Sequence, residues 1–203
     1  MNINDIDFKT GDIILYASNK GFFDKMIQKC SRSKYVHVAM VIKDPPTLKK
    51  GVYIIESCLN SNHDDIIDHK KVNGVQLHPL HDAINTYDSF DYYYRKLNII
   101  KKIDNITEKV WKIEGLLHGK PYDTKPLDWL EAEIRTIDPS IFHKQRTNTF
   151  WCSALVSYIY VKLGLMNIDL PWTLVSPKEF GTERETQLPF QGCNLDSEIK
   201  IKF

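Results

Sequence analysis

The sequence has 203 residues, 42% of them hydrophobic and 26% charged, which is enough for one sizeable domain with a buried core. Its 27 basic and 26 acidic side chains nearly balance, so a broad basic surface for nucleic acid is not expected. Residues 1–7 lack the pattern of a signal peptide, and no apolar run approaches the roughly 20 residues of a membrane-spanning helix, so the sequence predicts a cytoplasmic protein without a transmembrane segment.

The first half of the chain is predicted to consist mainly of strands. Phe22, Phe23, Met26, Ile27 and Cys30 fall at helical spacing and predict one amphipathic helix near residues 21–31. β-Branched and aromatic residues, with alternating polarity in several segments, indicate the strands. The predicted strands span residues 12–16, 35–42, 52–58, 74–78 and 92–97.

The second half is predicted to be mainly helical, with helices at 105–118, 126–135 and about 150–163. The last helix carries a single charge, Lys162, so it is expected to be central and buried, and Gly164 is a natural stop. Residues 198–203 suggest a final strand. A run of strands followed by a run of helices predicts an α+β domain built on an antiparallel sheet.

Cys152 lies just inside the start of the predicted apolar helix. We expect Asn148 or Thr149 to cap this helix with a side-chain oxygen. A thiol in the first turn feels the positive end of the helix dipole, which favours the nucleophilic thiolate. The simpler interpretation is that Cys152 is a small hydrophobic residue of the core. The four cysteines are widely scattered, which favours a reducing compartment.

His37 and Glu56 are the candidate partners of this cysteine. A symmetric hairpin that closes around Pro46-Thr47 places the two residues directly opposite each other on one face. A carboxylate there can orient the imidazole and stabilise its charged form. A slip of one residue would put them on opposite faces. Each residue alone has an ordinary structural explanation, but the set supplies a nucleophile, a base and an orienting group.

Other polar and aromatic groups are interpreted as structural. A polar cluster comprises His63, Asp64, Asp65, Asp68 and His69, with His78 and His81 nearby. It lacks the spacing of known metal motifs and suggests a solvated loop, so neither a metal nor a cofactor is expected. Tyr92–Tyr94 suggests a strand rather than a platform for bases. Cys30, Cys58 and Cys193 are expected to be inert.

Five segments in this order resemble those of a known family. They are Gly11–Leu15, Tyr35–Val41, Tyr53–Ser57, Gly119–Asp123 and Phe150–Val156. Together they resemble the YiiX/YaeF-like permuted papain-fold hydrolases of the NlpC-type superfamily. That superfamily has relatives in poxviruses and includes the lecithin retinol acyltransferase family. In the permuted group the histidine precedes the cysteine, as here, and the match runs from Gly11 to about Pro177.

The resemblance implies a circularly permuted papain-like fold, in which an antiparallel sheet packs on a buried helix that carries the cysteine. It implies one domain over residues 1–203 with a helical insertion at about 124–148. It further implies that Cys152 is the nucleophile, His37 the base, Glu56 the third catalytic residue and Tyr122 a support of the oxyanion site. One departure is Ala154, where the family often has an acidic residue. The insertion is a second departure, and it is expected to shape a different substrate cleft.

The predicted function is therefore that of a thiol hydrolase or acyltransferase acting on an amide, thioester or ester bond. The predicted substrate is a small acyl compound, a lipid or a peptide, and peripheral membrane contact is compatible with the sequence. The alternative is a non-catalytic papain-fold module that binds a lipid or a peptide, for example as a viral component in the host cytoplasm or virion. The sequence is compatible with a monomer or an oligomer.

Overall fold

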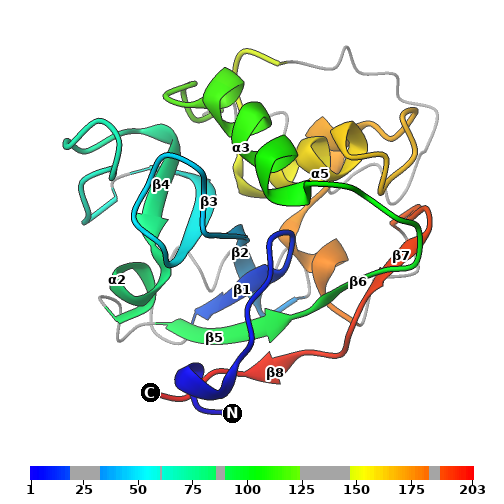
Figure 1. Ribbon diagram of the computed structural model, residues 1–203, viewed down its shortest axis with the longest axis horizontal. Coiled ribbons are helices and arrows are strands. Elements are labelled where there is room, and N and C mark those ends of the chain that lie inside the picture. The colour runs from blue at the N-terminus through cyan, green and yellow to red at the C-terminus, as the bar shows by residue number, and fades with distance from the viewer. Residues whose placement is uncertain (19–32, 60, 86–89, 124–146, 183–187) are drawn as a thin grey trace.

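The computed structural model describes residues 1–18, 33–59, 61–85, 90–123, 147–182 and 188–203. A six-stranded antiparallel sheet in the order β4-β3-β2-β1-β5-β8 forms its centre (Figure 1). Its strands are β1 (Ile13–Ser18), β2 (Tyr35–Lys43), β3 (Val52–Cys58), β4 (Gly74–Pro79), β5 (Phe90–Arg95) and β8 (Ile199–Lys200). A second sheet pairs β6 (Leu97–Ile99) with β7 (Cys193–Leu195).

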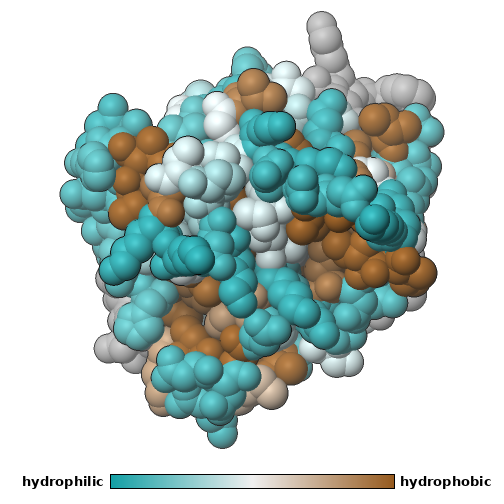
Figure 2. All heavy atoms as spheres, in the orientation of Figure 1, coloured by the Kyte–Doolittle hydropathy of each residue, from teal (hydrophilic) through white to brown (hydrophobic). Residues whose placement is uncertain are grey.

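Three α-helices surround the large sheet in the described ranges: α2 (Leu80–Asn85), α3 (Ile106–Leu117) and α5 (Cys152–Lys162). Short 3-10 turns span Ile3–Asp5 (η1), Trp172–Leu174 (η2) and Pro177–Phe180 (η3). Figure 1 shows α3 and α5 together on one side of the sheet and α2 near the end of β4. None of the described helices is long and apolar enough to cross a membrane. Hydrophilic side chains cover much of the face seen in Figure 2, in line with the 26% of residues that are charged.

The sheet is buried on both faces. Leu15, Met40 and Ile55 pack in a core that includes Val156 and Ile159 of α5. Residues of the opposite parity form a second core with α2, namely Ile14, Val41, Ile54, Leu80 and Ile84. This double burial explains why β1 is a continuous apolar run rather than an alternating pattern.

The structure confirms most of the strands and helices that the sequence predicts among the described residues. β3 has the predicted bounds, and α5 ends before Gly164, which adopts φ +67°. The sequence predicts one strand over 92–97, but β5 ends at Arg95 and the chain enters the second sheet at Leu97. The short elements α2 and β7 were not predicted. The predicted helices at 21–31 and 126–135 lie outside the described residues.

Asp12 holds the corner between these two sheets. Its carboxylate is fully buried and accepts hydrogen bonds from the backbone N–H groups of Leu97 and Lys9, at 2.8 and 2.7 Å, and from the Tyr94 hydroxyl at 2.9 Å. Burial raises the pKa of this carboxyl, although the three donors act in the opposite direction. The carboxylate therefore stabilises the chain as it leaves β5 for β6.

We expect Asp12→Ala to destabilise the fold by about 3 kcal/mol or more, because it leaves buried donors without an acceptor. The free energy of unfolding from urea titration measures this effect. Asp12→Asn keeps one acceptor oxygen and should lose less. Asp7→Ala removes a carboxylate whose side chain is 73% exposed and should change stability little. An Asp12→Ala protein as stable as Asp7→Ala would contradict the assigned role.

Candidate active site

The register between β2 and β3 decides how His37 and Glu56 meet. The ladder runs from the Lys43–Val52 pair to the Met40–Ile55 pair, so the hairpin is centred between Thr47 and Leu48. The predicted register, with His37 directly opposite Glu56, is therefore wrong by two residues. A shift of two residues preserves the face on which each side chain lies. The two residues become diagonal neighbours, which long side chains can bridge.

His37 and Glu56 are joined by a short hydrogen bond. His37 Nε2 lies 2.7 Å from Glu56 Oε2, and the two side chains are 17% and 9% exposed. The Tyr16 ring packs edge-on against the imidazole, with 4.7 Å between the ring centroids. The imidazole is thus held on one side by a carboxylate and on another by an aromatic ring. Its Nδ1 atom remains to exchange a proton with a third group.

Cys152 reaches this pair where β2 and β3 separate. The β2–β3 ladder ends at Met40–Ile55, and beyond it the Ser57 hydroxyl donates to the Phe150 carbonyl at 2.6 Å. This contact anchors the residues just before α5. The His37 ring and the backbone N–H groups of Val38 and Ser153 lie near enough to the Cys152 sulfur to lower the pKa of the thiol.

The start of α5 differs from the prediction in one respect. The N-cap is Trp151, without a side-chain hydrogen bond to the helix, rather than Asn148 or Thr149. The Thr149 hydroxyl instead donates to Asp123 Oδ2 at 2.9 Å. The backbone N–H groups of the first turn of α5 therefore receive no hydrogen bond from the side chain of the N-cap residue. They point out of the N-terminal end of the helix, where Cys152 lies.

Tyr122 is brought beside the cysteine by a close approach of two backbones. Gly74, at the start of β4, forms an antiparallel bridge with Pro121, and Tyr122 in turn bridges to Phe150. Gly74 has φ +148°, and a Cβ atom there would lie 2.0 Å from the Lys120 carbonyl oxygen. Only glycine permits this contact. The pKa of the Tyr122 hydroxyl is raised by burial and by the charges of Cys152, Cys58 and Asp123, so it stays protonated and can donate.

The electrostatics of the three residues favour an ion pair. Burial alone would raise the pKa of the Cys152 thiol, but the charge and hydrogen bond of His37, with the two backbone N–H groups, lower it. Burial opposes a charge on His37, yet Cys152 and then Glu56 raise the pKa of the imidazole. The pKa of Glu56 is lowered, because its bond to His37 outweighs its burial. The arrangement therefore favours thiolate, imidazolium and carboxylate together.

The other described cysteines lack such activation. Burial, with the charges of Glu56 and Cys152, raises the pKa of Cys58. Burial also raises the pKa of Cys193, whose sulfur contacts the Leu165 carbonyl. Both thiols are therefore protonated at neutral pH. The prediction for Cys30 falls outside the described residues.

We expect Cys152 to be alkylated at least about tenfold faster than Cys58 or Cys193 at pH 7, because thiolate is the reactive form. The rate should persist at pH values below the ordinary thiol pKa of about 8.5 and decline as the pH falls through the lowered pKa of Cys152. Limited iodoacetamide treatment at several pH values, followed by peptide mapping, measures these rates. Faster labelling of another cysteine would contradict an activated thiolate at Cys152.

A polar group around Glu56 was missed by the sequence reasoning. Gln76 pairs with Glu56 across β3 and β4, and its side-chain oxygen lies 2.8 Å from His78 Nε2. The same His78 nitrogen lies 3.8 Å from Glu56 Oε1. Gln76 and His78 alternate with buried apolar residues in a strand that is buried on both faces. Polar residues at such positions are the signal that could have indicated them.

The four residues that the sequence predicts for the site thus lie together at one end of α5.

The mixed α/β architecture, with its large antiparallel sheet, has a counterpart among solved structures. No protein-family model matches the sequence, and no curated protein matches it. Among solved structures, the chain is similar to the crystal structure of YiiX from Escherichia coli O157:H7, which is described as a metalloprotein. The TM-score is 0.52 at 17% identity, and the match covers 96% of each chain. The chain therefore has a YiiX-like fold.

Proposed function

We propose that this chain is a thiol hydrolase or acyltransferase that attacks an acyl bond through Cys152, His37 and Glu56. The observation that carries the proposal is the 2.7 Å contact between His37 Nε2 and Glu56, next to a Cys152 thiol whose pKa the charge of His37 lowers. Nucleophile, base and orienting group stand in the order that covalent catalysis requires.

The same proposal extends to the type of fold. The antiparallel sheet packs on the buried helix α5, which begins at Cys152, and the strand that carries His37 precedes this helix in the chain. These features support a permuted papain-like domain over residues 1–203. The proposed insertion at about 124–148 lies almost entirely outside the described residues.

Catalysis would proceed in two steps. The Cys152 thiolate attacks the carbonyl carbon, and the resulting tetrahedral intermediate expels the leaving group, which takes a proton from the His37 imidazolium. His37 then removes a proton from water or another acceptor, which attacks the thioester and releases Cys152. Glu56 holds the imidazole and stabilises its charged form throughout. The product is an acid in hydrolysis and a new ester or amide in transfer.

The oxyanion of the tetrahedral intermediate needs donors near the sulfur. The uncapped first turn of α5 offers the backbone N–H of Cys152, and the protonated hydroxyl of Tyr122 is a second candidate. These donors are fixed by backbone contacts at Phe150 and Pro121 before substrate arrives. Such preorganisation is the main source of stabilisation in acyl-transfer sites.

A metal ion does not fit the three proposed catalytic residues. His37 Nε2 and Glu56 Oε2 lie 2.7 Å apart, which is closer than a tetrahedral ion with bonds of about 2.0–2.1 Å would hold two of its ligand atoms. Among the described residues, the potential ligand atoms that converge in a set of three belong to a different group, Asp65, Asp68 and His118. The description of YiiX as a metalloprotein therefore carries no step of this mechanism.

The alternative proposal is a non-catalytic module whose groove binds a lipid or a peptide. A binding module has no need for an ion pair between a buried thiol and an imidazole, so the electrostatics favour the enzyme. We propose small acyl, lipid or peptide substrates rather than nucleic acid, and a reducing location such as the cytoplasm, where Cys152 stays a free thiol.

Activity-based profiling tests the proposal and separates the alternatives. Fatty-acyl and peptidyl electrophiles are offered to the wild-type chain and to Cys152→Ala. We expect covalent labelling of the wild type alone, with the preferred electrophile indicating the substrate class. A burst of leaving group would show the acyl-enzyme. Equal binding by both proteins, without labelling or turnover, would support the non-catalytic module instead.

A further inference from the structure

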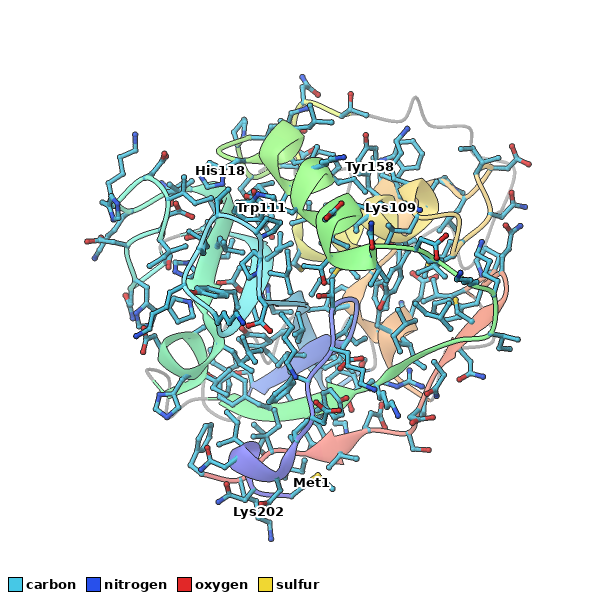
Figure 3. The ribbon with its side chains drawn as sticks, in the orientation of Figure 1. Met1, Lys109, Trp111, His118, Tyr158 and Lys202 are labelled. Carbon is cyan, nitrogen blue, oxygen red and sulfur yellow. The ribbon has the colours of Figure 1, made fainter. Side chains whose placement is uncertain are left out.

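Three potential ligand side chains, none of them among the proposed catalytic residues, meet at the end of α3. Asp65 and Asp68 come from the segment before β4, and His118 follows the last residue of α3. One ligand atom from each of them lies within 4.8 Å of the others. Figure 3 shows His118 at the end of α3 that lies nearer to β4. The sequence predicts a solvated loop around Asp65, but this side chain is fully buried, so the prediction is wrong at that residue.

His118 is oriented like a metal ligand. Its Nδ1 lies 2.6 Å from Oε1 of the buried Glu114, one turn earlier on α3. A carboxylate on one ring nitrogen fixes the tautomer and leaves the other nitrogen as the donor to a metal. That other nitrogen, Nε2, is buried and has no hydrogen bond. It faces Asp65 Oδ1 at 3.4 Å and Asp68 Oδ1 at 3.7 Å.

The spacing of these atoms fits a small divalent ion. A tetrahedral ion with bonds of about 2.0–2.1 Å separates its ligand atoms by about 3.3 Å. The two nitrogen–oxygen distances are slightly longer than this and exceed the usual length of a strong hydrogen bond. Asp65 is held in place by the backbone N–H groups of Ile67, Asp68 and Leu77, at 2.7–2.8 Å. One ligand is thus positioned before any ion binds.

The charges of the cluster also favour a cation. Three carboxylates, from Asp65, Asp68 and Glu114, surround one imidazole. The described residues provide one further cationic contact, Lys70 at 3.7 Å from Asp68, and the Lys70 side chain is 71% exposed. A single proton on His118 leaves this negative charge largely uncompensated, whereas a divalent ion offsets more of it. The Asp68 side chain is 34% exposed and provides a route of entry.

We propose that Asp65, Asp68 and His118 bind one divalent first-row transition ion, such as Zn²⁺, with water as a further ligand. One imidazole nitrogen and two carboxylate oxygens form a donor set suited to such an ion. The site would join the segment before β4 to the end of α3. Its role would be structural and independent of the proposed reaction at Cys152.

Calorimetric titration of the metal-free full chain with Zn²⁺ tests this site. The protein carries Cys152→Ala, so that the reactive thiol does not bind the ion. We expect one Zn²⁺ per chain and a melting temperature higher by about 5 °C when free Zn²⁺ exceeds the Kd about 100-fold. Absence of binding in this protein would overturn the proposal.

Three further substitutions in the Cys152→Ala protein locate the ion. Asp68→Asn removes a ligand that accepts no backbone N–H, so the fold should persist while Zn²⁺ affinity falls at least about tenfold. His118→Gln should abolish binding. Asp64→Asn changes an exposed carboxylate of the same segment and should leave affinity unchanged. Unaltered affinity in Asp68→Asn and His118→Gln would show that Zn²⁺ binds elsewhere and that the cluster is an ion-pair network only. If His118→Gln does not fold, the comparison of Asp68→Asn with Asp64→Asn decides.

Discussion

His37→Ala is expected to reduce turnover by about 1,000-fold, within the range that general acid–base catalysis contributes. The substitution removes both the proton acceptor and the imidazolium that lowers the pKa of Cys152. The thiol would then be buried without its main counter-charge, and only the dipole of α5 and two backbone N–H groups would favour thiolate. We therefore expect alkylation of Cys152 to slow in the same variant and to require higher pH.

The two readouts of His37→Ala should change together. Turnover is measured with a substrate of the class that activity-based profiling indicates, and alkylation is measured by peptide mapping. His81→Gln is the matched control, because it changes an exposed histidine on α2. A His37→Ala protein that keeps both its turnover and its pH profile would remove His37 from the mechanism and leave Cys152 without a base.

Glu56→Gln is expected to reduce turnover by about 100-fold while the fold persists. Glutamine has nearly the same shape and can still accept the hydrogen bond from His37 Nε2, but it lacks the charge that stabilises imidazolium. The pKa of His37 should fall, so the descending limb of the pH–rate profile should move to lower pH. We expect the melting temperature to change by only a few degrees.

The turnover, the pH profile and the melting temperature of Glu56→Gln together show which role the carboxylate has. Full activity in Glu56→Gln would make the carboxylate a bystander and leave a Cys152–His37 dyad. A large decrease in melting temperature would instead show that Glu56 stabilises the sheet, through its neighbours Gln76 and His78. Gln76→Glu tests the surroundings from the other side, because a second carboxylate beside Glu56 should raise its pKa and weaken its effect on His37.

The sequence predicted the principal strands because their signals are local. The bounds of β3, and the face of the sheet on which His37 and Glu56 lie, follow from the β-branched and alternating residues of these two short segments. The register was wrong because the turn around Thr47 contains no residue pair that fixes a hairpin type. The side chains of His37 and Glu56 are nevertheless in contact, because an error of two residues in the register leaves each side chain on the same face of the sheet.

Other features depend on contacts between distant residues and could not be predicted. The end of β5 depends on Asp12, which accepts the Leu97 N–H from a segment 85 positions away. The start of α5 lacks its predicted cap because Thr149 bonds to Asp123. Gln76 and His78 join the site only through the pairing of β3 with β4. In each case the partner is determined by tertiary structure, which local propensity does not contain.

Gly74 affects the candidate active site because it has no Cβ atom, although it does not itself belong to the site. The residue lies in a bridge that sets how closely Pro121 and Tyr122 approach β4, and Tyr122 is bridged in turn to the segment before Cys152. A methyl group at this position would displace the Lys120 carbonyl and, with it, the hydroxyl proposed to face the oxyanion. In a survey of all single substitutions, position 74 should therefore tolerate change as poorly as the nucleophile itself, although it never meets the substrate.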